Sequence, residues 1–191
     1  MGHTTTHLGY LDVKIHDGRY SWRMSSRHDP ADDVDAIVAA WHRELPDLDV
    51  EPLHVFSRVT RLARLLDLDR MNAFARHALE GWEFDVLSAL RRAGEPHQLS
   101  PGRLVQETLV TSGTMTNRID RLAKKGWVER LPSPTDRRGV IVRLTKGGQD
   151  TVDAAMADLL ARERGLLDEM PVEQQAALAG ALRRLLTPFE V

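Results

Sequence analysis

One predicted helix, which begins at Thr111 or Ser112 and ends at Lys125, carries a polar face opposite an apolar stripe. Three apolar side chains at helical spacing would form its buried stripe: Met115, Ile119 and Leu122. The opposite face is short and polar, and it can both donate and accept hydrogen bonds, as a helix in the major groove must. The residues predicted to touch DNA are Ser112, Thr114, Thr116, Asn117, Arg121 and Lys124.

These residue types differ in what they would contact. Asn117 and Arg121 can make bidentate hydrogen bonds with adenine and guanine, and Thr116 can bond a base edge or touch a thymine methyl group. Ser112, Thr114 and the helix N-terminus suit phosphates. A polar face that is merely solvated is the alternative interpretation.

A turn-rich stretch further along the chain supplies a second set of cations. Asp136, Arg137 and Arg138 precede Gly139 in a predicted hairpin tip, and arginine is attracted to the negative potential of a narrow minor groove. DNA would repel Asp136, so we expect this carboxylate to orient Arg138 through a bidentate pair. Charges that prevent pairing at the sheet edge are the alternative role.

The charge distribution fits an anionic partner for the middle of the chain. The 191 residues hold 26 Lys and Arg against 28 Asp and Glu, a net charge of −2. Residues 81–146 nevertheless carry 12 basic and 7 acidic side chains, so this stretch is +5 and the remainder is −7. An uneven surface without function would give the same imbalance.

Other classes of protein lack support in the sequence. There is no cysteine for a disulfide, thiolate or nucleophile, no glycine-rich phosphate loop and no G-x-S-x-G turn. Apart from His3 and His7, the histidines do not lie at metal-ligand spacing. No apolar run approaches a membrane span. We therefore expect a cytoplasmic, non-enzymatic protein without a cofactor.

The order of the predicted elements is that of a winged helix-turn-helix. The segment 1–30 shows no usable periodicity, and Met24 is an alternative start of the natural chain. The elements expected after it are helices over 32–45, 52–77, 82–92, 100–106 and 111–125, strands over 127–131 and 140–144, and helices over 145–167 and 172–186. We expect a mainly α fold with a small β-hairpin wing, flanked by N- and C-terminal helices for dimerisation.

This order divides the chain by role. We predict a flexible N-terminal segment (1–30), N-terminal helices for dimerisation and a pocket (31–80), a DNA-binding region (81–145) and C-terminal dimerisation helices (146–191).

A resemblance supports this division. Residues 126–130 (GWVER) and 136–148 (DRRGVIVRLTKGG) resemble the signature of the MarR family across the wing and the following helix. The resemblance spans roughly residues 50–186 and implies a homodimeric winged-helix regulator that binds an inverted repeat. The terminal helices would form the dimer interface, and a continuous monomeric core is the alternative.

An extra helix over 32–45 makes the sequence similar to the branch that contains the urate-responsive regulators and the PecS and TamR types. In that branch a ligand pocket is associated with a Trp, an Asp and two Arg, which match Trp41, Asp85, Arg118 and Arg130 here. The resemblance implies a small anionic effector, urate first and a tricarboxylate such as trans-aconitate second.

The helical phase suggests how such an anion would act. Arg118 flanks the buried stripe, and we expect Asp85 to pair with it in the free protein. An anion that pairs with Arg118 and Arg130 and contacts Trp41 would shift the DNA-reading helix, so anion and DNA would oppose each other's binding. Plainer roles are apolar packing for Trp41, a structural Asp85–Arg118 salt bridge and a phosphate contact for Arg130.

Together these features predict a repressor released from DNA by a small anion. The alternative is a helical dimeric carrier protein that has lost DNA binding. Activation instead of repression would depend on the operator, which the sequence does not reveal.

Overall fold

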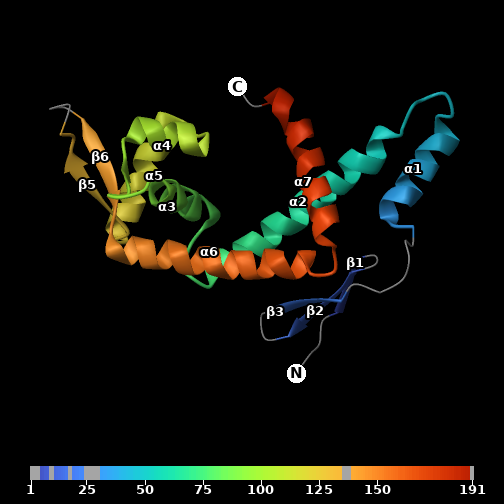
Figure 1. Ribbon diagram of the computed structural model, residues 1–191, viewed down its shortest axis with the longest axis horizontal. Coiled ribbons are helices and arrows are strands. Elements are labelled where there is room, and N and C mark those ends of the chain that lie inside the picture. The colour runs from blue at the N-terminus through green and yellow to red at the C-terminus, as the bar shows by residue number, and fades with distance from the viewer. Residues whose placement is uncertain (1–4, 9–10, 17–18, 24–30, 135–138, 190–191) are drawn as a thin grey trace. The chain divides into compact units, whose positions relative to one another are not determined.

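The structure is a computed structural model that describes residues 5–8, 11–16, 19–23, 31–134 and 139–189. It is mainly helical with small antiparallel sheets, which confirms the predicted fold class (Figure 1). The helices are α1 (Asp33–Glu44), α2 (Pro52–Ala75), α3 (Gly81–Arg92), α4 (Pro101–Thr108), α5 (Ser112–Lys124), α6 (Lys146–Leu167) and α7 (Val172–Leu186), with the 3-10 turn η1 (Thr187–Phe189). The strands are β1 (Thr5–Leu8), β2 (Leu11–His16), β3 (Arg19–Arg23), β4 (Gln98–Leu99), β5 (Val128–Pro132) and β6 (Val140–Leu144). None of the helices in these ranges combines the length and hydropathy that crossing a bilayer demands.

Capping side chains determine where helices α4, α5 and α6 begin. The hydroxyl oxygens of Ser100, Thr111 and Thr145 each accept the backbone N–H three residues ahead, at 3.2, 3.3 and 3.1 Å. These bonds satisfy N–H groups that the first helical turn leaves unpaired. The starts of α4, α5 and α6 therefore follow from the sequence alone.

The wing is a sheet of three strands in the order β4-β6-β5. Strands β5 and β6 pair antiparallel from Val128 opposite Leu144 to Pro132 opposite Val140. The predicted hairpin is thus confirmed, whereas β4, which pairs Leu99 with Val142, was not predicted. A strand of two residues is too short to show a periodic pattern.

One hydrophobic core joins the end of α2 to α3, α4, α5, α6 and the wing. The three predicted stripe residues of α5 lie inside it, with Met115 and Ile119 each 1% exposed and Leu122 fully buried. Phe74 of α2 stacks on Phe84 of α3, with ring centroids 4.1 Å apart. Burial of one face of α5 fixes which side chains this helix presents to solvent.

The N-terminal segment contains three strands where the sequence analysis found no usable periodicity. Strand β2 pairs antiparallel with β1 and β3, for example Val13 opposite Thr6 and Trp22. In β2 the apolar residues Leu11, Val13 and Ile15 alternate with polar ones, a period-2 signal that the sequence analysis missed.

The chain divides into two compact units, residues 1–67 and 68–191, so the boundary falls inside α2. The first unit has a small core of Val34, Val38 and Val50. Its helices are joined by Arg58, which binds Asp32 at 2.9 Å and Asp35 at 2.8 Å. The division by role into 1–30, 31–80, 81–145 and 146–191 remains a prediction.

Candidate nucleic-acid interface

Helices α4 and α5 form the helix-turn-helix, and the turn between them is tight. Leu109 ends α4 with a φ of 53°, a left-handed conformation that reverses the chain within a few residues. Thr111 then caps α5, and its hydroxyl lies 2.9 Å from that of Thr114. Helix α5 contacts α4 and β5 (Figure 1), and Ser112 and Thr114 in its first turn are exposed.

Five of the six predicted DNA contacts on α5 are open to solvent and lack a charged partner among the described residues. Ser112, Thr114, Thr116, Asn117 and Lys124 are all exposed. The Thr116 hydroxyl donates to the Ser112 carbonyl at 3.1 Å, an internal bond of the helix. Within the described ranges, the Asn117 amide has no hydrogen-bond partner, so its donor and acceptor remain available to a ligand.

Arg121, the sixth predicted contact, is held by residues that the sequence analysis did not single out. Its guanidinium donates to Glu80 Oε1 at 2.6 Å and lies over the ring of Trp82, 4.6 Å from the centroid. Trp82 Nε1 donates to the other oxygen of Glu80 at 2.6 Å. The Trp82 hydrogen bond first, and the Arg121 charge after it, hold the pKa of Glu80 below its ordinary value.

A second contact of the same kind lies one helical turn further along. Lys125 Nζ is 2.6 Å from Oε1 of Glu83, a fully buried side chain, and it also donates to the Ala78 carbonyl at 3.3 Å. The start of α3 therefore binds the C-terminal end of α5 through two ion pairs, Glu80–Arg121 and Glu83–Lys125. The spacings of three between the acids and four between the cations are visible in the sequence, but nothing local shows that these pairs meet.

The predicted wing cations fall outside the described residues. Asp136, Arg137 and Arg138 belong to the undescribed range 135–138. On either side of it the hairpin is regular, and the Ser133 N–H donates to the Gly139 carbonyl at 2.9 Å. The groove contact predicted for Arg137 and Arg138 and the orienting role predicted for Asp136 stay predictions.

The four predicted ligand residues divide between the two units. Trp41 lies on α1 in the first unit and is 47% exposed, whereas the other three lie in the second unit. Asp85 is exposed on α3 and Arg118 is half-buried on α5. Arg130, at β5, binds Asp120 at 2.8 Å and donates to the Thr116 carbonyl at 3.5 Å, so it ties the wing to α5.

The expected pairing of Asp85 with Arg118 is wrong for this structure. Among the described residues neither side chain takes part in an ion pair, and the Arg118 guanidinium instead lies 5.4 Å from the centroid of the Trp82 ring. An arginine that covers an aromatic face and keeps contact with water does not need a carboxylate partner. Charge alone predicted Asp85 as the partner of Arg118, whereas the structure places the Trp82 ring there.

Comparison with known proteins agrees with this geometry. The model of the MarR family matches residues 79–139, which include α3, α4, α5 and β5. The HTH-type transcriptional regulator PecS of Dickeya dadantii is 35% identical over 80% of this chain and 92% of its own length.

Two solved structures resemble the fold. A MarR mutant from E. coli complexed with operator DNA is 28% identical with a TM-score of 0.55, over 73% of this chain and 99% of that one. A MarR family regulator from Streptomyces coelicolor in complex with DNA has a TM-score of 0.65 at 23% identity, over 75% and 94%. The chain therefore belongs to the MarR family of winged helix-turn-helix DNA-binding transcriptional regulators, and within it to the branch that includes PecS.

Proposed function

We propose that this regulator is a homodimeric repressor that leaves an inverted-repeat operator when it binds a small anion. The observation that carries the DNA-binding part is the outward face of α5, where Asn117 is exposed and unpaired above a fully packed stripe. Such a face can enter a major groove without unfolding any contact of the core.

The DNA contacts follow from this placement. Asn117 and Thr116 would meet base edges, while Ser112, Thr114 and Lys124 would meet phosphates near the two ends of the helix. Arg137 and Arg138 would add minor-groove contacts, with Asp136 orienting Arg138.

A second copy of the chain would complete the molecule. Helix α7 buries none of its residues, and its apolar side chains are open to solvent, among them Val172, Leu178, Leu182, Leu185 and Leu186. Exposed apolar area on this scale marks an interaction surface. Two copies related by a two-fold axis would present two α5 helices to an inverted repeat.

The effector would be a planar anion of the urate class or, second, a tricarboxylate such as trans-aconitate. Arg118 supports this assignment, because it is half-buried, carries no ion pair among the described residues and lies on the same helix as Asn117. A carboxylate or urate anion would gain a bidentate partner there. Trp41, Asp85 and Arg130 remain the other proposed pocket residues.

DNA as the partner supports a cytoplasmic, non-enzymatic role. The test is a titration of fluorescent DNA from upstream of the gene, with and without urate and trans-aconitate. We expect tight, salt-sensitive binding that one of the two anions reverses, and an Arg118→Ala variant that binds DNA but no longer responds.

The other outcomes separate the parts of the proposal. Binding that neither anion changes would remove both effectors and keep the DNA function. Failure to bind any upstream DNA, together with binding of either anion, would favour the carrier protein.

A further inference from the structure

Arg121 is the cation of α5 whose observed position departs most from that of a free DNA contact. Its guanidinium, Glu80 and Trp82 form a closed set of three contacts, in which each carboxylate oxygen accepts one donor at 2.6 Å and the guanidinium covers the ring. The carboxylate offsets the charge of Arg121 and fixes the direction of its side chain. Glu80 uses one N–H of this guanidinium and places a negative charge beside it, which opposes the approach of a DNA phosphate.

A neighbouring, more buried pair also attaches α5 to α3. Glu83 is fully buried against Lys125 and provides a fixed link between α3 and α5. The Glu80 and Arg121 side chains are by contrast 55% and 54% exposed. An ion pair this open to water adds little stability to the fold. Its main effect is therefore on the position of the Arg121 charge.

Non-specific DNA affinity is set mainly by the number of phosphates that free cations neutralise, whereas base contacts set sequence preference. A cation on α5 that is kept away from phosphates would therefore lower the non-specific DNA affinity without changing the sequence preference.

We propose that Glu80 and Trp82 are positioning residues that withhold Arg121 from the phosphates of non-operator DNA and thereby raise the specificity of the helix. This inference rests on the proposed DNA-binding function. Asn117 then reads the operator, while Arg121 does not strengthen binding elsewhere.

The direct test is Glu80→Gln, which keeps an acceptor for the Trp82 N–H but removes the charge that holds Arg121. Binding to an operator duplex and to a scrambled duplex of equal length is measured by fluorescence anisotropy over a series of salt concentrations. On scrambled DNA we expect several-fold tighter binding and a salt slope steeper by about 0.9, the increment for one more phosphate contact. The ratio of operator to scrambled affinity falls.

Three further variants separate positioning from a general charge effect. Adding Glu80→Gln to Arg121→Gln should leave the slope of Arg121→Gln unchanged. Glu95→Gln removes the same charge from a side chain that is 84% exposed and whose ion-pair partner among the described residues is His97. The salt slope of this variant should equal that of the wild type. Trp82→Phe keeps a ring but loses the bond to Glu80, and it should lie between wild type and Glu80→Gln.

Two results would overturn the inference. An unchanged slope and ratio in correctly folded Glu80→Gln and Trp82→Phe would show that Arg121 is not withheld. A steeper slope that persists in the double variant would show that Glu80 acts without Arg121. Wild-type protein that binds no duplex would instead defeat the proposed function, a distinct result visible before any variant is compared.

Discussion

At the scale of single residues, Asn117 is the side chain on which base recognition by α5 should depend most. It is exposed on the reading helix and, within the described ranges, has no competing partner. We expect Asn117→Ala to lower the preference for the correct base pair by about 1–3 kcal/mol and to leave the salt slope unchanged. Competition binding with operators that carry single base changes measures this.

Two control variants distinguish the loss of a base contact from the loss of a phosphate contact. Lys124→Ala should weaken binding to all sequences alike and reduce the salt slope by about 1, and so should Arg138→Ala at the wing. An Asn117→Ala protein that still discriminates every base as the wild type does would show that another residue reads the operator.

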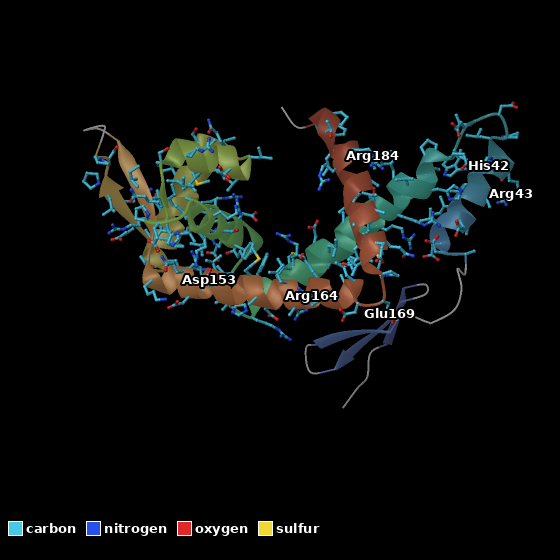
Figure 2. The ribbon with its side chains drawn as sticks, in the orientation of Figure 1. His42, Arg43, Asp153, Arg164, Glu169 and Arg184 are labelled. Carbon is cyan, nitrogen blue, oxygen red and sulfur yellow. The ribbon has the colours of Figure 1, made fainter. Side chains whose placement is uncertain are left out.

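Asp153, labelled on α6 in Figure 2, links pH to stability through its ion pair with Arg91 of α3. Arg91 donates to its carboxylate at 2.9 Å, and this bond holds the pKa of Asp153 below its ordinary value of 3.8. A carboxyl with a lower pKa in the folded state stabilises the fold above its unfolded pKa, and this stabilisation disappears as the pH falls through the folded pKa.

We therefore expect Asp153→Asn to lower the free energy of unfolding near neutral pH, with a difference from wild type that shrinks steadily below about pH 4. Urea unfolding at a series of pH values measures it. Asp150→Asn, on the same helix but paired within it to Lys146, is the control and should cost less. A difference that is the same at neutral and acidic pH would mean that packing, and not the ion pair, carries the effect.

At the scale of elements, the sequence predicts what short-range patterns determine. The helix starts expected near residues 100, 111 and 145, the stripe of α5 and strand β6 are found where the patterns placed them, because each signal lies within a few residues. Short-range patterns do not predict the contacts between elements. Glu80 and Arg121 are 41 positions apart, and no periodicity reports that they meet.

The same limit explains the wrong pairing of Asp85 with Arg118. Opposite charge made the pair plausible, but the choice between Asp85 and Trp82 depends on how α3 packs on α5, which charge alone does not encode.

The junction between wing and α6 tests packing at the element scale. A Cβ on Gly148 would lie 2.2 Å from the Trp127 carbonyl oxygen, whereas one on Gly147 would meet only the Thr145 hydroxyl oxygen at 3.9 Å. We expect Gly148→Ala to destabilise the fold by about 1–3 kcal/mol, the usual cost of overpacking, and Gly147→Ala to change it little. Chemical denaturation of the two proteins gives the comparison, and equal stabilities would show that α6 can shift away from the wing without cost.

At the scale of the whole molecule, the helix-turn-helix and wing bury their apolar side chains far more completely than α1, most of α2 and α7 do. The winged region has a continuous core around Leu87, Leu90 and Leu122. Helix α7 has none of its residues buried, and apolar side chains along α1 and α2, such as Trp41 and Phe56, are about half exposed. Hydrophobic burial is the main favourable term in folding, so these faces need a partner to contribute to it.

We expect that partner to be a second copy of the chain, and α7 offers the sharpest test. Leu178 and Leu182 lie one turn apart on α7 and are 41% and 37% exposed. Replacing both by Glu should convert a dimer into monomers in sedimentation velocity, because charges would have to be buried in the interface. Operator affinity should fall on the order of 100-fold, since two linked reading helices gain from effective concentration.

Arg184→Glu is the control, because Arg184 is also on α7 but points to the other side of the helix from Leu182. This variant should remain a dimer and bind the operator with a modest loss. If the double Leu variant stays dimeric, the apolar faces of α1 and α2 become the interface to test next. If it is monomeric yet binds the inverted repeat as tightly as the wild type, the operator is read by one chain, and the two-fold arrangement of α5 helices is wrong.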